Sequence, residues 1–176
     1  MRIDGHRQVE RTAVFQQTLA LGEALTLAGS DPFVVEFGQM TYTPAQPWTG
    51  AHRFTKHYFE PGPGDLRIEG EEFECAVFLD ELPEVECWVR NLTRRPGSFW
   101  LQTSSDRFCP DFVSLLSDGR ILVVEYKGAD RWDGLDAEEK RAVGAVWESR
   151  SNGGCLFVMP QGRDLNAIRT KVSSSR

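Results

Sequence analysis

The sequence of 176 residues has no long apolar run, few cysteines and no excess of positive charge. No stretch reaches the roughly 20 apolar residues of a membrane-spanning helix, and no secretory signal is recognisable. We therefore expect neither membrane insertion nor secretion. The four cysteines are widely spaced, without a Cys-x-x-Cys pair, which argues against zinc ligands and disulfides. Each cysteine falls in an apolar segment, so we expect buried free thiols and a reducing, cytoplasmic location.

The net charge of −6 argues against a protein that binds nucleic acid by bulk electrostatics alone. It does not exclude a nuclease, because an acidic metal site itself contributes negative charge while basic residues gather elsewhere. Two basic clusters are candidates for DNA contact, although each is also typical of an ordinary solvated surface. The first cluster precedes the central acidic motif and comprises Arg90, Arg94, Arg95 and Arg107. The second lies in the C-terminal tail and comprises Arg163, Arg169, Lys171 and Arg176.

The length and a hydrophobic content of 40% are typical of one globular domain with a small extension. We expect residues 1–52 to form an N-terminal extension with a helix from His6 to Ala28 and a short strand from Pro32 to Phe37. A proline-containing loop from Thr43 to Gly50 then leads into a core domain of residues 53–176.

The core domain is predicted to be an α/β fold with a central mixed β-sheet flanked by helices, because an antiparallel hairpin is followed by a helical crossover. Periodicity and breakers predict these elements in order: a strand at Arg53–Phe59, a helix at Glu69–Leu82, a strand at Glu84–Arg90 paired with Ser98–Gln102, a hairpin of Phe112–Leu116 with Ile121–Val124, a helix at Leu135–Arg150, a strand at Cys155–Met159 and a helix at Leu165–Val172.

The hairpin segment FCPDFVSLLSDGRILVVEYKG is the most informative part of the chain. Its Asp-Gly pair between two apolar runs predicts a primed two-residue turn. Antiparallel pairing then places Asp111 near the level of Lys127. Glu125 and Lys127 are two residues apart, so they project from the same face of the strand, and the carbonyl of Tyr126 lies close by. The site would offer Mg²⁺ two carboxylates, Asp111 and Glu125, and the Tyr126 carbonyl as oxygen ligands. Solvated charges at strand ends are the alternative.

Further candidates lie on the helices and the loop that flank this hairpin. Glu72 would supply a third acid from the first core helix, with Glu71 left open as the alternative, and an exposed acid at a helix start as the ordinary interpretation. Lys140 would reach the scissile phosphate from the second helix, unless it is simply an exposed lysine. Trp132 lies in a polar loop and is the better candidate for contact with DNA, whereas Trp88 and Trp147 are expected in the core.

The ordered set of motifs resembles a known nuclease family, and single members of the set are weaker signals than their order. The segments that carry the resemblance lie between residues 53 and 160 and are Glu71–Ala76, Trp88–Asn91, Phe108–Phe112, Asp118–Arg120, Glu125–Gly128, Lys140, Trp147 and Leu156–Met159. They are similar to the C-terminal nuclease region of type III restriction enzyme Res subunits, which belong to the restriction-endonuclease-like PD-(D/E)XK superfamily. The chain departs from that family because it has no Gly-x-x-x-x-Gly-Lys-[Ser/Thr] motif, so ATP-driven translocation cannot be transferred to it.

The resemblance implies a Mg²⁺-dependent DNA endonuclease, with Mn²⁺ as a substitute metal. Asp111 and Glu125 would bind the metal, and Lys127 would orient or deprotonate the attacking water. A separate helicase, translocase or methyltransferase subunit would work with the chain, and a homodimer would supply two active sites for a double-strand break. Two alternatives stay open: a non-catalytic nuclease-fold module that docks to DNA or to a motor subunit, and a transposon-end or repair endonuclease of the same fold.

Overall fold

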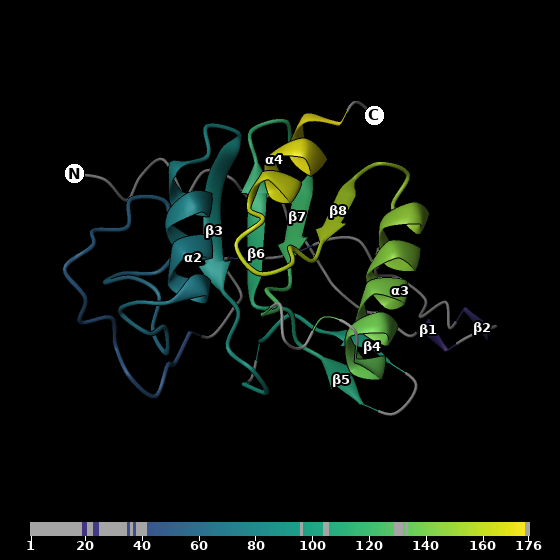
Figure 1. Cartoon of the computed structure of the whole chain (residues 1–176), viewed down its shortest axis with the longest axis horizontal. Helices are drawn as coiled ribbons and strands as arrows, with labels where there is room; N and C mark the ends of the chain where they lie inside the picture. The colour runs from purple at the N-terminus through teal and green to yellow at the C-terminus, as the bar shows by residue number, and fades with distance from the viewer. Residues whose placement is uncertain are drawn as a thin grey trace.

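A four-stranded mixed sheet lies at the centre of the computed structural model of the chain (Figure 1). The structure describes residues 19–20, 23–24, 35, 37, 42–95, 97–103, 106–128, 132 and 134–174. In sheet order the strands are β3 (Val85–Arg90), β6 (Phe112–Leu116), β7 (Ile121–Val124) and β8 (Cys155–Val158). Both the β3–β6 and β6–β7 pairs are antiparallel, and β8 is parallel to β7. The carboxyl ends of β3, β7 and β8 therefore meet the amino end of β6 at one side of the sheet, which we call the carboxyl edge.

The hairpin of β6 and β7 is confirmed, but its turn differs from the predicted primed type. Of the turn residues, all of which the structure describes, only Gly119 has a positive φ, at 85°. The Gly119 N–H donates to the carbonyl of Leu116 at 2.9 Å, and the Leu116 N–H donates to the carbonyl of Arg120 at 2.9 Å. A three-residue loop that ends in a left-handed glycine explains this pattern, because it needs positive φ at one position only.

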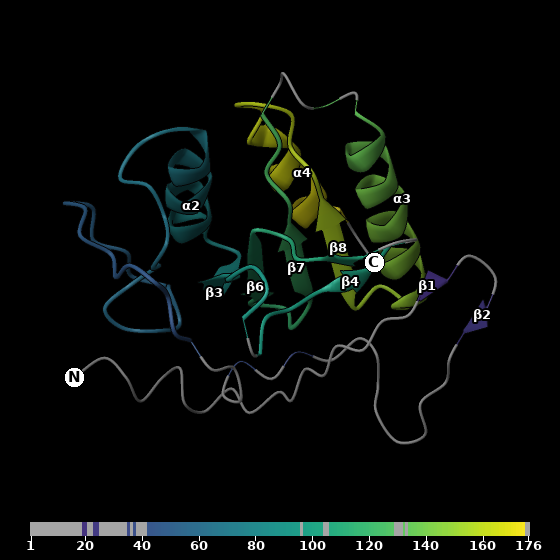
Figure 2. The same ribbon diagram turned by 90° about the horizontal axis from the view of Figure 1, so that it is seen from below.

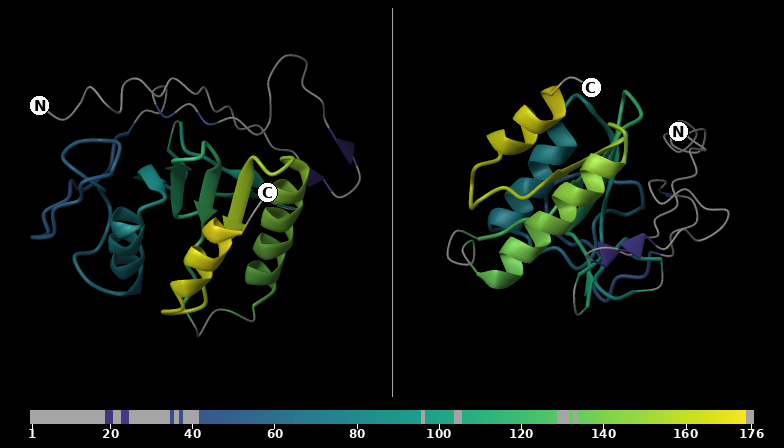
Figure 3. Two further views of the ribbon diagram at one scale, coloured as in Figure 1. Left: turned by 90° about the horizontal axis from the view of Figure 1, so that it is seen from above. Right: turned by 90° about the vertical axis from the view of Figure 1, so that its right-hand side faces the viewer.

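Helices pack into the two hydrophobic clusters on opposite faces of the sheet. Figures 2 and 3 show one helix near the β3 end of the sheet and another near the β8 end. Helices α2 (Glu71–Glu81) and α4 (Asn166–Ser173) pack with the strand side chains of one face. Helix α3 (Leu135–Arg150) packs on the other face, together with a small hairpin of β4 (Leu101–Gln102) and β5 (Arg107–Phe108). The prediction of a mixed sheet flanked by helices is therefore confirmed, and the helix bounds lie within three residues of those predicted.

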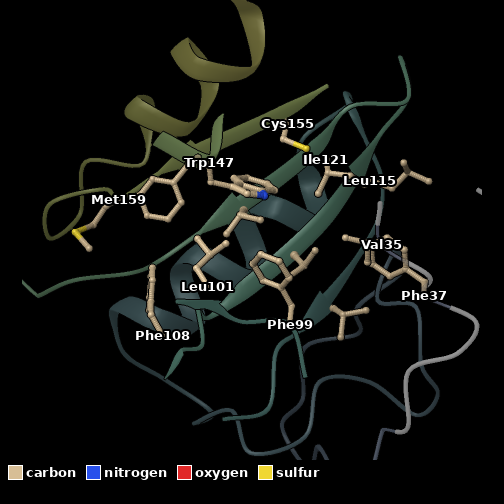
Figure 4. Close-up of a cluster of buried hydrophobic side chains, with 14 of the residues drawn as sticks. Val35, Phe37, Phe99, Leu101, Phe108, Leu115, Ile121, Trp147, Cys155 and Met159 are labelled. Atoms are coloured by element: carbon tan, nitrogen blue, oxygen red, sulfur yellow. The ribbon is translucent and has the colours of Figure 1, made fainter. Parts of the chain in front are cut away.

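Strands β7 and β8 are continuous apolar runs because both of their faces are buried. All four residues of β7 are buried, and alternate ones belong to the two hydrophobic clusters on opposite sides of the sheet. Trp88 belongs to the cluster under α2 and α4, and Trp147 of α3 belongs to the other cluster, shown in Figure 4, so both are core residues as expected. Three of the cysteines are buried free thiols, and Cys109 is half-buried.

One predicted strand pairing and one predicted strand are wrong. Residues 98–102 do not pair with the strand at residues 85–90; β4 pairs instead with β5, because β6 occupies one side of β3. Residues 53–59 do not form a strand and contribute only a parallel bridge between His57 and Trp88 on the other side of β3. The buried carboxylate of Asp80 accepts hydrogen bonds from the backbone N–H groups of Thr55 and Lys56, both at 2.8 Å. These two groups therefore do not need a strand partner.

Most of the predicted N-terminal helix, His6 to Ala28, lies outside the described residues. The four residues of it that the structure describes form two short strands, β1 (Leu19–Ala20) and β2 (Glu23–Ala24), which pair antiparallel, so the helix is wrong at these positions. Of the strand predicted at Pro32–Phe37, Val35 and Phe37 are described and neither is in a strand; both side chains are buried in the core. Within the described segments, no helix has the length and apolar character needed to cross a membrane.

Candidate functional site

Two acidic side chains meet at the carboxyl edge of the sheet. Asp111 directly precedes β6 and Glu125 directly follows β7, and the register pairs Phe112 with Val124, so the two acids lie side by side. The backbone N–H of Tyr126 donates a hydrogen bond of 2.7 Å to Oδ2 of Asp111. The two carboxyl groups are close enough to hydrogen-bond to each other when one is protonated. The hairpin thus brings together the pair of acids that the sequence predicted. The predicted register is wrong by about two residues, because Asp111 lies level with Glu125 and not with Lys127.

Burial and mutual repulsion change the proton affinity of this acid pair. Burial, followed by the charge of Glu125, raises the pKa of Asp111 to about 7, against the opposing effects of Arg90 and the Tyr126 N–H. Glu125 is only 5% exposed, and its burial also raises its pKa, which the ammonium of Lys140 opposes. Two carboxylates in one desolvated site cannot both be ionised without a compensating cation. Near neutral pH the pair therefore binds a proton or requires a positive charge.

Two lysines, Lys127 and Lys140, lie near the acid pair, but they make different contacts. The Nζ atom of Lys140, on α3, lies 3.1 Å from Oε1 of Glu125. The Nζ atom of Lys127 lies 2.9 Å from Oδ2 of Asp136, and its charge still lowers the pKa of Glu125. Lys127 was the predicted catalytic amine, yet Lys140 is the lysine that contacts an acid of the pair directly. The hairpin pattern could not predict this contact, because Lys140 belongs to α3 and not to the hairpin.

Helix α2 brings a third acid to the same place. Glu72, in the first turn of α2, forms an ion pair with Arg90 at 2.5 Å. Its burial raises its pKa, and the nearby charge of Asp111 raises it further. Glu72 therefore lies near the acid pair, as predicted. The alternative acid, Glu71, instead accepts a hydrogen bond from the hydroxyl group of Tyr126.

Asn91 is a positioning residue that the sequence interpretation did not single out. Its side chain is 2% exposed, and its amide nitrogen donates to the carbonyl oxygens of Phe99 at 2.8 Å and Pro110 at 2.7 Å. Its amide oxygen accepts from the N–H of Phe99, and its own N–H donates to the carbonyl of Asp111 at 2.8 Å. Asn91 thus holds the backbone at Asp111. The available signal was an uncharged polar residue directly after the predicted strand, between Arg90 and Leu92.

The residues predicted to bind DNA fall into two groups. Arg90 and Lys140 belong to the acidic site, and Arg90 is only 13% exposed, so it contributes charge to the site rather than to an outer surface. The other three arginines are exposed: Arg94, which pairs with Asp106; Arg95; and Arg107, which lies over the ring of Trp100.

Trp132 makes contacts that limit its availability for base stacking. Its indole packs against the core cluster around α3. The guanidinium of Arg141 lies 4.5 Å from the ring centroid and also donates to the Trp132 carbonyl at 2.9 Å. One face of the indole is therefore occupied by a cation.

The donor set of the acid pair fits a hard divalent cation. Asp111 and Glu125 offer carboxylate oxygens, and Mg²⁺ is commonly bound by one or two carboxylates with water and substrate oxygens as its remaining ligands. Across the described parts of the chain, no group of three His, Cys, Asp or Glu side chains is arranged to hold a metal by itself. The protein would thus supply two carboxylate ligands, together with the Tyr126 carbonyl predicted from the sequence.

No protein-family model matches the chain, and comparison with curated proteins and with solved structures finds no match. The fold and the site consequently define a class only: an α/β domain with a mixed sheet that carries a buried acid pair and two lysines at its carboxyl edge. What this arrangement does must be argued from its own chemistry.

Proposed function

We propose that the chain is a metal-dependent nuclease that hydrolyses phosphodiester bonds in DNA. The observation that carries this proposal is the buried pair of Asp111 and Glu125, with two lysine ammonium groups beside it. Paired acids that repel each other favour binding of a divalent cation, and adjacent ammonium groups favour a phosphate.

The order of elements supports a restriction-endonuclease-like fold. From α2 onward the chain runs through one helix, the antiparallel strands β3, β6 and β7, helix α3, and strand β8 parallel to β7. Together with the Pro-Asp and Glu-x-Lys motifs at the carboxyl edge, this order resembles the PD-(D/E)XK nucleases, and the type III restriction Res subunits in particular.

In the proposed site, Asp111 and Glu125 hold a Mg²⁺ ion. When bound, the ion would acidify a water molecule and neutralise charge on the phosphoryl group. The protein groups contribute the rest: Lys127 and Lys140 orient the phosphate and balance the negative charge of the acids. Arg90 keeps Glu72 at the border of the site through their ion pair.

The proposed mode of DNA delivery follows from the charge balance. A chain with a net charge of −6 attracts DNA weakly, and the exposed arginines Arg94, Arg95 and Arg107 provide only a local basic surface. We infer that a separate helicase, translocase or methyltransferase subunit brings DNA to the site, and that two copies of the chain act together on the two strands.

The proposal is tested by incubating the purified chain with supercoiled plasmid and with short labelled duplexes, with Mg²⁺, with Mn²⁺ and with a chelator. We expect metal-dependent nicking that leaves 5′-phosphate ends, which DNA ligase can reseal. Asp111→Asn should remove this activity, and Glu125→Gln should do the same. Metal binding, measured by Mn²⁺ electron paramagnetic resonance, should weaken by about tenfold to a hundredfold or more in both variants.

Asp164→Asn is the matched control, because Asp164 is an exposed acid on the loop before α4. It should retain both metal binding and nicking. The proposal is wrong if the Asp111→Asn protein, folded and free of contaminating nuclease, nicks DNA as fast as the wild type. Metal affinity that is equal in the wild type and both site variants would also contradict it.

A further inference from the structure

Two ammonium groups converge on a single carboxylate oxygen beside the acid pair. The Nζ atom of Lys127 lies 2.9 Å from Oδ2 of Asp136, and the Nζ atom of Lys140 lies 3.2 Å from the same oxygen. Lys127 comes from the segment after β7, whereas Lys140 comes from the second turn of α3. The two elements thus present two charged donors to one point in space.

The two lysines are more confined than the acid that they contact. The side chains of Lys127 and Lys140 are 13% and 19% exposed, whereas that of Asp136 is 68% exposed. Three groups hold Lys140: Glu125 lies 3.1 Å from its Nζ, Asp136 lies on the preceding turn of the same helix, and the ring centroid of Phe108 lies 5.0 Å away. The positive site is therefore built into the protein, and the carboxylate reaches it from the solvent side.

The point where the ammonium groups of Lys127 and Lys140 meet carries positive charge and therefore favours an anion. The carboxylate of Asp136 has a lowered pKa, first because of its hydrogen bond with Lys127 and then because of Lys140. An oxygen held by two ammonium groups matches one oxygen of a phosphate, which has further oxygens for the metal on the adjacent acid pair. A carboxylate side chain can satisfy the lysines but offers no bond to hydrolyse.

We propose that Lys127 and Lys140 form a binding site for a phosphate group, and that Asp136 occupies this site until a phosphate displaces it. The inference rests on the proposed nuclease function only for the source of the phosphate, which would be a DNA backbone. Because Asp136 is exposed, its ion pairs contribute little free energy and are easily exchanged. Asp136 therefore acts as a built-in competitor of the substrate, and it lowers affinity for phosphate without closing the site.

The test is phosphate binding by the whole chain in the presence of a chelator, so that no cleavage interferes. Inorganic phosphate is titrated by calorimetry at low ionic strength, and a labelled duplex is titrated by fluorescence anisotropy. Asp136→Ala should bind phosphate about two- to tenfold more tightly than the wild type, the range expected for release of exposed ion pairs. In the Asp136→Ala background, Lys127→Gln should remove this gain.

Glu138→Ala is the matched control, because Glu138 is an exposed acid in the first turn of the same helix. It removes the same formal charge, so a general electrostatic effect would raise affinity equally in both variants. Circular dichroism checks that all variants fold. The inference is overturned if Asp136→Ala gains no more affinity than Glu138→Ala, or if the gain survives Lys127→Gln.

The two probes identify the source of the phosphate. A gain for both inorganic phosphate and the duplex assigns the site to nucleic acid, and a gain for inorganic phosphate alone assigns it to a small phosphate ligand. Either result supports the lysine site. Failure of the nuclease proposal looks different, since it appears as absent Mg²⁺-dependent nicking while the phosphate affinities still respond to Asp136→Ala.

Discussion

The side-chain amide of Asn91 donates a hydrogen bond of 2.7 Å to the carbonyl oxygen of Pro110, the residue directly before Asp111. Asn91 directly follows β3, and Asp111 directly precedes the neighbouring strand β6. The same side chain also binds the backbone of Phe99 through both its donor and its acceptor. One buried amide therefore connects the loop after β3 to the start of the candidate catalytic strand.

Asn91→Ala should destabilise the chain and misplace Asp111. It leaves the backbone carbonyls of Phe99 and Pro110 and the N–H of Phe99 without their amide partner in a buried region. We expect a loss of about 2–4 kcal/mol in the free energy of unfolding, measured by urea denaturation. Asn166→Ala, at an exposed position in α4, should change it by less than about 0.5 kcal/mol. Equal effects of the two substitutions would contradict the positioning role.

The metal-free protein should lose stability as pH rises from about 4 to 7 because of Asp111. Its folded-state pKa is raised to about 7 from 3.8, so within this window the folded state keeps a proton that the unfolded state releases. Asp111→Asn removes this cost. The variant should be more stable than the wild type by roughly 1–3 kcal/mol at pH 8 in a chelator, and the difference should shrink toward pH 4.

Thermal unfolding at a series of pH values measures this difference, with Asp164→Asn as the matched control at an exposed position. Addition of Mg²⁺ at pH 8 should raise the melting temperature of the wild type and of Asp164→Asn, but not that of Asp111→Asn. A wild-type protein whose stability at pH 8 equals that of Asp111→Asn would show that the acid pair carries no electrostatic cost.

His57 should give the opposite dependence on pH. Burial lowers its pKa to about 4 from 6.5, against the opposing effects of its hydrogen bond with the Phe59 carbonyl and of the Asp80 charge. Its Nδ1 lies 2.7 Å from the carbonyl oxygen of Phe59, and its Nε2 accepts the N–H of Arg90 at 3.3 Å. The unfolded state therefore binds a proton that the folded state does not, so stability falls as pH drops from about 6.5 to 4. His57 alone should lower the free energy of unfolding by about 2–3 kcal/mol over this range.

The measurement is the free energy of unfolding of the wild type and of His57→Gln between pH 7 and pH 4. Glutamine offers a donor and an acceptor without titrating in this range. The variant should lack the fall in stability that His57 causes between pH 6.5 and pH 4, whatever its stability at pH 7, and should keep the opposite dependence caused by Asp111. An identical pH dependence in both proteins would rule out a neutral, buried His57.

Gly144 allows the close approach of α3 to β8. A Cβ atom at this position would lie 2.2 Å from a ring carbon of Phe157. Gly144→Ala should therefore destabilise the fold by about 1–3 kcal/mol through overpacking, although alanine favours a helix over glycine. Ser149→Ala, at an exposed position of the same helix, should be neutral or slightly stabilising. Urea denaturation distinguishes the two, and a stabilised Gly144→Ala protein would disprove the contact.

Local sequence patterns were sufficient for the elements whose residues are all buried or strictly periodic. The apolar runs of β6 and β7 and the Asp-Gly pair between them predicted the hairpin, which gathers Asp111 and Glu125 at one end of the sheet. The predicted register set Asp111 near the level of Lys127, whereas the observed register sets it level with Glu125. The same patterns failed to identify the backbone partners of two other segments. Residues 53–59 do not form a strand because Asp80 binds their backbone, and residues 98–102 pair with β5.

The sequence by itself determined which acids meet, because adjacent antiparallel strands bring residues of one hairpin together whatever surrounds them. Only the tertiary structure decided which cations serve those acids. Lys140 contacts Glu125 because α3 packs across the sheet, and Lys127 is held by Asp136 of the same helix. A long, flexible ammonium side chain takes its position from the charges around it, and these charges come from elements that only packing brings together.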